Sequence, residues 1–222
     1  MTDLKGTKLF SAFDENGDVK HGLPSTAYTN DDFYELEAGQ LFAKSWTFVG
    51  FANDLAQIGD VMPVRVAGQP LFLVRSANDK IRAFHNVCRH RNLKLVDKAH
   101  NCKNLITCPY HNWCYNLDGQ LRVAPFFGGS KTELPKQFRL EDHGLQEVTC
   151  RLYHDWLFVN LSGDAQAFEA HIAPLKKQLA DFDLEDFIMI ASIEFGEIKT
   201  NWKLLMENFI EPYHVQFVHK TT

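Results

Sequence analysis

Two short pairs of metal-binding side chains constrain this sequence more than any other feature. The first pair is Cys88 and His90, the second is Cys108 and His111, and seventeen residues separate the two. Each pair follows a short run that is typical of a strand, so each is expected on a loop at a strand end. Two such loops can close on one inorganic centre from opposite sides, each with one thiolate and one imidazole.

The pairing of cysteine with histidine distinguishes between two kinds of centre. Iron–sulfur clusters usually take four thiolates, but in Rieske [2Fe–2S] centres two histidines replace two cysteines on one iron. A single zinc ion with two cysteines and two histidines is the alternative, although zinc fingers usually pair Cys with Cys and His with His. The C-x-H and C-x-x-H spacing therefore favours the cluster over zinc.

The residues around the pairs resemble a known family. The strings CRHRN and CPYHNWCYNLDGQL are similar to those of ring-hydroxylating Rieske non-haem iron oxygenase α subunits. Respiratory Rieske proteins carry an extra cysteine in each loop, whereas Leu93 and Tyr110 stand there in this chain, which indicates the ferredoxin or oxygenase kind. Asn92 and Asn112 replace the family's usual glycines, and we expect left-handed turns at both because asparagine tolerates a positive φ.

A second motif begins at Asn201 and reads NWKLLMENFIEPYHVQFVH. It resembles the string that opens the catalytic domain of the same family. By this resemblance, His214 and His219 bind a mononuclear Fe(II), which a later carboxylate completes as a facial triad. The resemblance gives Glu211 the role of an inter-subunit bridge for electrons. Without the family, two ordinary helix histidines and a solvated carboxylate are the alternatives.

The spacing of His214 and His219 requires an irregular helix. Side chains five positions apart on a regular α-helix point about 140° apart, so they would not meet on one ion. Pro212 has no N–H for the carbonyl of Asn208 and should interrupt the helix. The sequence therefore predicts a helix over residues 200–219 with a break near Pro212.

The earlier part of the chain predicts a helix followed by a β domain. Helical spacing over residues 30–44 follows Thr29 and Asp32, which resemble a capping box. Short β-branched and aromatic runs then recur at roughly ten-residue intervals, as in a small antiparallel sandwich. Hairpin turns are expected at residues 118–119 and 154–155.

These elements predict an α+β protein in three parts. Residues 1–42 form an N-terminal arm and helix, and residues 43–162 form the antiparallel β Rieske domain. Residues 163–222 begin a catalytic domain, which by resemblance has a helix-grip (START-like) fold. Within that last part we expect a helix over residues 165–181 and a strand over residues 188–198.

Composition excludes several classes of function. The net charge is −5 without a Lys/Arg-rich run, so nucleic acid is not an expected partner. Without a signal peptide or a long apolar stretch, we expect no membrane partner and a cytoplasmic location. Five cysteines are an odd number, which argues against a disulfide framework. Cys102, Cys114 and Cys150 are interpreted as small buried hydrophobic residues.

By resemblance, the protein is a mono- or dioxygenase. A reductase, with or without a ferredoxin, would pass electrons from NAD(P)H to the [2Fe–2S] cluster and then to the mononuclear iron, where O₂ is activated and a small organic substrate is hydroxylated. The family forms homotrimers or α₃β₃ assemblies. The expected substrate is aromatic or quaternary-amine-like. Glu211 replaces the commoner Asp, which resembles members that act on non-aromatic or quaternary-amine substrates.

The chain ends at Thr222, three residues after His219. The third iron ligand and the substrate pocket are therefore expected in the remainder of a longer protein, and the chain alone should hold a cluster without turnover. Two other functions are the alternatives. A Rieske ferredoxin would have no use for the motif that begins at Asn201, and a zinc module for protein interaction would contain no sulfide.

Overall fold

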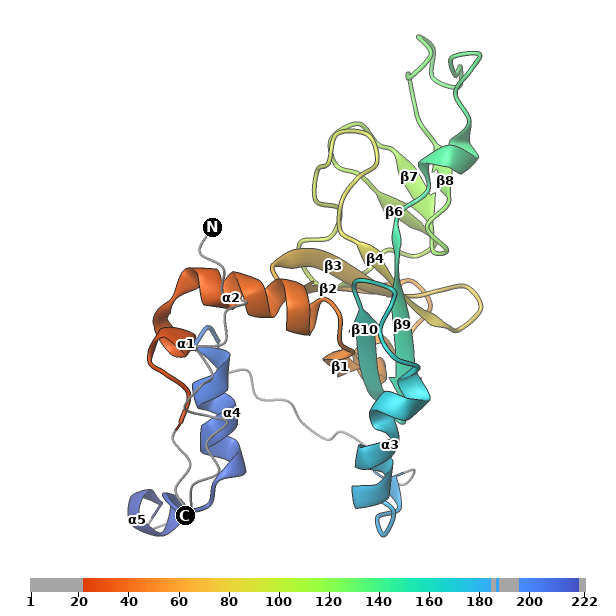
Figure 1. Ribbon diagram of the computed structural model, residues 1–222. Coiled ribbons are helices and arrows are strands. Elements are labelled where there is room, and N and C mark those ends of the chain that lie inside the picture. Colours follow the sequence, from red (N-terminus) through yellow and green to blue (C-terminus); the bar gives the residue numbers. More distant parts are fainter. Residues whose placement is uncertain (1–21, 185–186, 188–195, 220–222) are drawn as a thin grey trace. The chain divides into compact units, whose positions relative to one another are not determined.

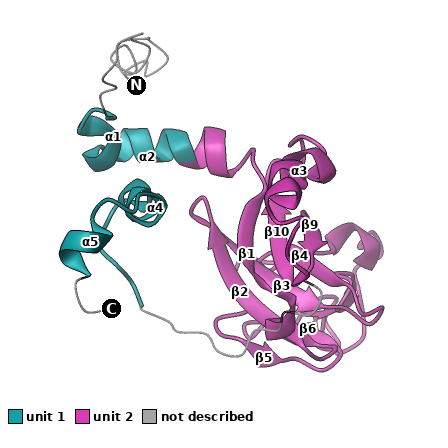
Figure 2. Cartoon of the chain, turned by 90° about the horizontal axis from the view of Figure 1, so that it is seen from below, with its two compact units in different colours: residues 1–37, 190–222 teal, residues 38–189 magenta. Residues whose placement is uncertain are grey.

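The computed structural model describes residues 22–184, 187 and 196–219. The chain divides into two compact units, which are coloured in Figure 2: unit 1 comprises residues 1–37 and 190–222, and unit 2 comprises residues 38–189. The predicted α+β class is confirmed, since helices and antiparallel sheets are both present (Figure 1). The strand predicted over residues 188–198 lies almost entirely outside the described residues.

A seven-stranded antiparallel sheet forms the main part of unit 2. Its order is β1-β10-β9-β4-β3-β2-β5, so the first strand pairs with the last, β10, at one edge, and β9 pairs with β4 in the middle. The strands are β1 (Thr47–Phe51), β2 (Asp60–Val66), β3 (Gln69–Arg75), β4 (Ile81–His85), β5 (His100–Asn101), β9 (Glu147–Tyr153) and β10 (Trp156–Asn160).

A smaller sheet of three strands carries the second cysteine–histidine pair. Its strands are β6 (Leu105–Thr107), β7 (Cys114–Asn116) and β8 (Leu121–Val123). Both predicted hairpins are confirmed, because β7 pairs with β8 and β9 pairs with β10. At the first turn Gly119 has φ +82, and a Cβ there would lie 2.5 Å from the Phe84 ring. This turn therefore needs glycine for conformation and for space.

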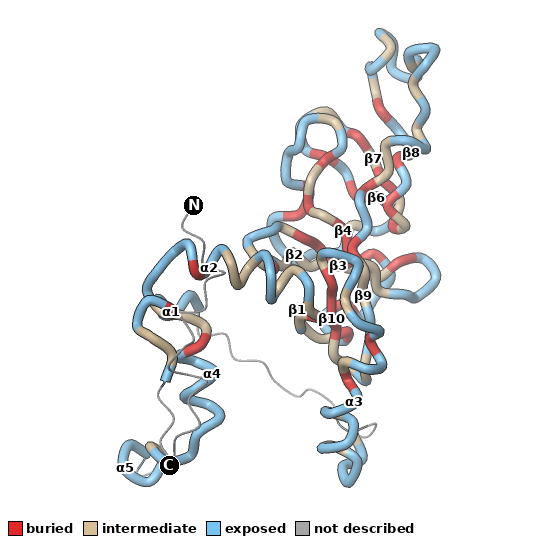
Figure 3. The backbone as a smooth tube through the Cα atoms, in the orientation of Figure 1, coloured by how far each residue is buried: buried red, intermediate tan, exposed pale blue. Residues whose placement is uncertain are grey.

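Strand β3 separates two cores on the two faces of the large sheet. Phe72 and Val74 pack with the small sheet, whereas Leu71 and Leu73 pack with the β9–β10 hairpin. This alternation follows from the two-residue period of a strand, and all four residues are fully buried. Figure 3 shows buried residues in red along the backbone of unit 2. The loops that hold the cysteine–histidine pairs rest on the first of these cores.

The N-terminal helix is confirmed in outline, but its cap is not the one predicted. The Oδ1 atom of Asn30 accepts the Phe33 N–H at 2.9 Å, whereas the Thr29 hydroxyl donates to the Ser25 carbonyl. Thr29 ends a preceding turn of helix, so it cannot cap the next one. The segments are α1 (Thr26–Thr29), α2 (Asp31–Glu37) and a π-helical turn, η1 (Ala38–Phe42).

The later helices also follow the sequence pattern with shorter bounds. Helix α3 covers Phe168–Gln178, inside the predicted 165–181, and packs its apolar side on Trp46. The predicted interruption near Pro212 is confirmed, because α4 (Trp202–Ile210) and α5 (Val215–Val218) are separate helices. Among the described residues, none of the helices has the length and apolarity needed to cross a membrane.

Candidate metal centres

The two loops with the cysteine–histidine pairs have the same backbone pattern. In each, the cysteine N–H donates to the carbonyl five residues later, at 2.8 Å for Cys88 and 2.9 Å for Cys108. The asparagine four residues later donates back to the cysteine carbonyl at 3.0 Å in both loops. Asn92 and Asn112 have φ values of 57° and 54°, so the predicted left-handed turns are confirmed. Each loop is thus a closed turn that fixes its cysteine.

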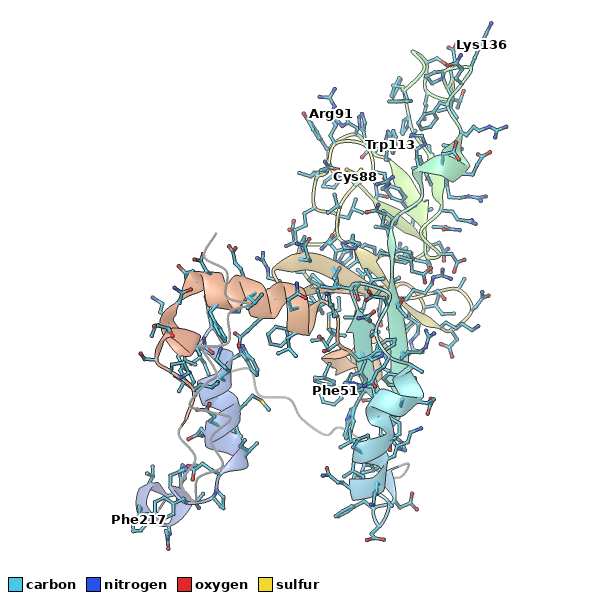
Figure 4. The ribbon with its side chains drawn as sticks, viewed as in Figure 1. Phe51, Cys88, Arg91, Trp113, Lys136 and Phe217 are labelled. Carbon is cyan, nitrogen blue, oxygen red and sulfur yellow. The ribbon has the colours of Figure 1, made fainter. Side chains whose placement is uncertain are left out.

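The structure brings the four predicted side chains together in pairs. Burial raises the pKa of the Cys108 thiol, and a hydrogen bond with the Cys88 thiol raises it as well. Both cysteines are buried, with 1% and 2% exposure. The imidazole rings of His90 and His111 lie 4.6 Å apart between centroids. Figure 4 places Cys88 with Arg91 and Trp113 at one end of unit 2.

The inner nitrogens of the two imidazoles match an inorganic centre. The Nδ1 atoms of His90 and His111 are buried and have no hydrogen-bond partner within the described part of the chain. Buried polar atoms are nearly always paired, so two such atoms side by side indicate a missing ligand. Burial lowers the pKa of His90, as do His111 and Arg91 nearby, which favours the neutral form that binds metal.

The arrangement fits a two-iron cluster better than one zinc ion. Over residues 22–184, 187 and 196–219, no three His, Cys, Asp or Glu side chains are arranged to hold a single ion. A zinc site needs four ligands on one ion, whereas a Rieske cluster places two thiolates on one iron and two imidazoles on the other. The pairing of thiol with thiol and imidazole with imidazole corresponds to the second arrangement.

Aromatic side chains that the sequence motif did not single out surround these loops. The indole of Trp113 stacks on His90 with 4.7 Å between centroids and 6° between planes. The ring of Tyr110 lies against His111 at 3.8 Å. Trp113 and Tyr115 stand at alternate positions just before and within β7, and both are buried. This alternation is the sequence signal that could have identified them.

Tyr115 contacts the first cysteine directly. Its hydroxyl oxygen accepts the Arg89 N–H at 3.0 Å and lies 3.3 Å from the Cys88 sulfur. Burial, with the bond to Cys88, raises the pKa of the Tyr115 hydroxyl, so the group stays protonated. Because its oxygen is already an acceptor, the hydroxyl proton is available to a Cys88 thiolate.

The remaining cysteines are not among the four predicted cluster ligands. Cys102, Cys114 and Cys150 are half-buried, and Cys102 and Cys150 pack against the two cores of unit 2. Burial raises the pKa of Cys102 to about 11 and that of Cys150 to about 12, so both remain thiols. They are therefore only partly the buried hydrophobic residues that the sequence predicted.

The second site lies in unit 1, where α4 ends. Glu211 leaves the helix with an extended backbone (φ −108, ψ 126), which turns the chain before His214. The rings of His214 and His219 lie 5.6 Å apart, so the interrupted helix brings together two side chains that a regular helix would separate. These two imidazoles form one side of the candidate metal site.

Glu211 is paired with the first of these histidines. One of its carboxylate oxygens contacts Nδ1 of His214, and the other accepts the Tyr213 N–H at 2.7 Å. The hydrogen bond with His214 lowers the pKa of the Glu211 carboxyl. A carboxylate on Nδ1 leaves Nε2 of His214 for a metal and orients the ring, as in many metal sites.

Comparisons with known proteins identify the families that the two parts of the chain resemble. The model of the Rieske [2Fe-2S] domain family matches residues 45–136, and that of the ring hydroxylating alpha subunit (catalytic domain) matches residues 177–222. The glycine betaine monooxygenase oxygenase subunit of Chromohalobacter salexigens is 34% identical, over 90% of this chain and 43% of that protein. The carnitine monooxygenase oxygenase subunit of Acinetobacter baumannii is 32% identical, over 96% of this chain and 56% of that protein.

A solved structure shows the same fold. The quaternary ammonium Rieske monooxygenase CntA superposes with a TM-score of 0.82 at 30% identity, over 92% of this chain and 56% of that one. The chain spans about half the length of the curated relatives it matches. It belongs to the Rieske non-haem iron oxygenases, as part of the α subunit. The cofactors of this class are a [2Fe–2S] cluster and a mononuclear iron.

Proposed function

We propose that this chain is the electron-accepting part of a Rieske monooxygenase that hydroxylates a quaternary-ammonium compound. The single observation that carries the proposal is the pair of closed loops, whose two buried imidazole nitrogens have no hydrogen-bond partner among the residues that the structure describes. The relatives named for glycine betaine and carnitine support the choice of substrate class. When bound, the cluster supplies single electrons and the mononuclear iron supplies activation of O₂.

In this proposal the four side chains of the Rieske loops divide between two irons. Cys88 and Cys108 would hold one iron, and His90 and His111 would hold the other through Nδ1. The neutral imidazoles reduce the negative charge of the centre, which raises its potential relative to a cluster with four thiolates. The proposed Rieske domain extends over residues 43–162.

In the catalytic part, His214 and His219 hold the mononuclear iron, and a carboxylate outside this chain completes the triad. Glu211 fixes the orientation of His214 through its Nδ1–H. Each carboxylate oxygen has a second lone pair, so Glu211 can also accept a hydrogen bond from a cluster histidine of a neighbouring subunit. We retain residues 163–222 as the beginning of a helix-grip domain.

The proposed partners follow from these roles. A reductase, with or without a ferredoxin, would deliver electrons from NAD(P)H to the imidazole side of the cluster. A head-to-tail ring of three α subunits would close a heterologous interface and bring Glu211 of one subunit to the Rieske loops of the next.

The test uses the full-length protein with a reductase. Metal and sulfide analysis should give a [2Fe–2S] centre together with mononuclear iron. NAD(P)H-dependent O₂ uptake should accompany hydroxylation of glycine betaine or carnitine. The carbon isostere 3,3-dimethylbutanoate, which keeps the shape and the carboxylate of glycine betaine but lacks its positive charge, should not be hydroxylated.

Two results would overturn the proposal in different ways. Zinc without acid-labile sulfide would rule out the [2Fe–2S] cluster and therefore the oxygenase function. Hydroxylation of aromatic acids, with both quaternary amines untouched, would leave the oxygenase class intact and replace the substrate class.

A further inference from the structure

Unit 1 contains a buried ion pair that none of the proposed metal sites uses. The Lys203 ammonium lies 2.8 Å from both carboxylate oxygens of Glu37. The two side chains are 7% and 11% exposed, so both charges have lost nearly all contact with water. These residues are 166 positions apart in the sequence.

Aromatic rings enclose the ammonium on its remaining sides. The ring centroids of Tyr28, Phe33 and Trp202 lie 5.5, 5.2 and 5.2 Å from the Lys203 nitrogen, within range of cation–π attraction. The indole N–H of Trp202 donates to Glu37 at 3.1 Å. The carboxylate is therefore shared between two neighbouring donors of α4.

Two further hydrogen bonds tie the same helix to the N-terminal segment. The Asn201 side chain caps α4 through the Lys203 N–H and donates to the Tyr28 carbonyl at 3.0 Å. The Tyr28 hydroxyl donates to Glu207 at 2.6 Å. Three consecutive residues at the start of α4, and one residue further along it, thus all bond to α1 or α2.

The ion pair of Glu37 and Lys203 is better explained as a means of fixing the position of α4 than as a source of stability. A buried ion pair often gives no more stability than apolar residues of the same size, because desolvation offsets the attraction. Its specific effect is to hold both partners in one arrangement, here with two carboxylate oxygens and three ring faces. Within α4, which the structure describes in full, Lys203 is the buried residue, and the later positions Phe209 and Ile210 are 81% and 73% exposed.

We propose that Glu37 and Lys203 are positioning residues for the iron-ligand segment, an inference that rests on the proposed iron site at His214 and His219. The pair fixes the start of α4, and the helix runs without interruption to Ile210, immediately before Glu211. The N-terminal helices therefore serve the catalytic iron, although they precede the Rieske domain in the sequence.

The test compares variants of the full-length protein. Glu37→Gln and Lys203→Met each leave one buried partner without its counterpart. The double variant Glu37→Leu/Lys203→Met removes both charges and should restore the melting temperature. Lys203→Arg keeps the charge and can still bond both carboxylate oxygens. The exposed pair of Lys176 and Glu169 on α3 provides the matched control, as Lys176→Met.

The readouts separate positioning from folding. In both single variants and in the double variant, Fe(II) affinity at the mononuclear site should fall at least fivefold, and the EPR spectrum of its nitric oxide adduct should broaden. The cluster spectrum should stay unchanged, and Lys176→Met should match the wild type in every readout. Lys203→Arg, which keeps the charge, should lose less Fe(II) affinity than Lys203→Met.

Each adverse outcome has a distinct meaning. A double variant that regains both its melting temperature and the wild-type iron spectrum would show that the pair serves folding alone. Single variants with unchanged Fe(II) affinity would overturn the positioning role while the proposed function stands. A wild-type protein that binds no iron at His214 and His219 would overturn the proposed function and this inference together.

Discussion

The Rieske loops and the iron-ligand segment differ in burial and in backbone hydrogen bonding. Cys88 and Cys108 are at most 2% exposed, on loops that close by matched backbone hydrogen bonds. The second segment is open, since Tyr213 is 75% exposed and Phe217 58%. The four candidate cluster residues lie within one short stretch of two loops. The positioning role proposed for Glu37 and Lys203 would instead make the segment of His214 and His219 depend on residues far away in the sequence.

The largest effect is expected from removal of a cluster thiolate. Cys108→Ser should abolish the visible absorption and EPR signal of the [2Fe–2S] centre, because one iron loses a thiolate ligand. Iron at the mononuclear site should remain, since that site lies in the other unit. Cys114→Ser, a half-buried cysteine of β7, is the control and should keep the cluster. A loaded cluster in Cys108→Ser would show that the loops are not its site.

The next effect concerns the connection between the two regions. Glu211→Gln in the full-length protein should leave both centres loaded but slow turnover by roughly 100-fold, as loss of a residue that orients a metal ligand does. Single-turnover oxidation of the reduced cluster measures the affected step. Glu197→Gln, an exposed carboxylate upstream of α4, is the control. A wild-type rate in Glu211→Gln would rule out Glu211 as the inter-subunit bridge for electrons.

A smaller effect tests how self-contained the Rieske unit is. Gly119→Ala should destabilise unit 2 by about 1–3 kcal/mol beyond the backbone strain, because its Cβ would overlap the Phe84 ring. Gly68→Ala is the matched control, since Gly68 also has a positive φ but no atom within 4 Å of the added Cβ. Denaturant unfolding measures both. Equal losses of unfolding free energy in Gly119→Ala and Gly68→Ala would show that the Phe84 ring moves aside at no cost.

The smallest effect is a shift in potential. Tyr115→Phe removes a hydrogen bond of about 1 kcal/mol to the Cys88 sulfur, which for a one-electron couple is roughly 40 mV. The potential should fall, because the bond stabilises the more negative reduced state. Tyr110→Phe, an exposed tyrosine beside His111, should leave it unchanged. Protein-film voltammetry measures the potential of both variants. An unchanged or a raised potential in Tyr115→Phe would contradict this expectation.

The features that the sequence predicted correctly are local. The left-handed turns at Asn92 and Asn112, the two hairpins and the break near Pro212 each depend on residues within a few positions of one another. Such features follow from backbone sterics and turn chemistry, which neighbouring residues decide. The helix cap was predicted one residue too early, because Thr29 and Asn30 are both suitable caps and only the end of α1 selects between them.

The sequence by itself determined the class of this protein, since the spacing of Cys88, His90, Cys108 and His111 suits few centres other than a Rieske cluster. Only the tertiary structure decided that Tyr115 reaches the Cys88 sulfur and that Lys203 pairs with Glu37, 166 residues away. A lysine in an amphipathic helix normally faces water. Its burial here depends on rings and a carboxylate that chain folding brings from the N-terminal helices, and no local pattern specifies such a contact.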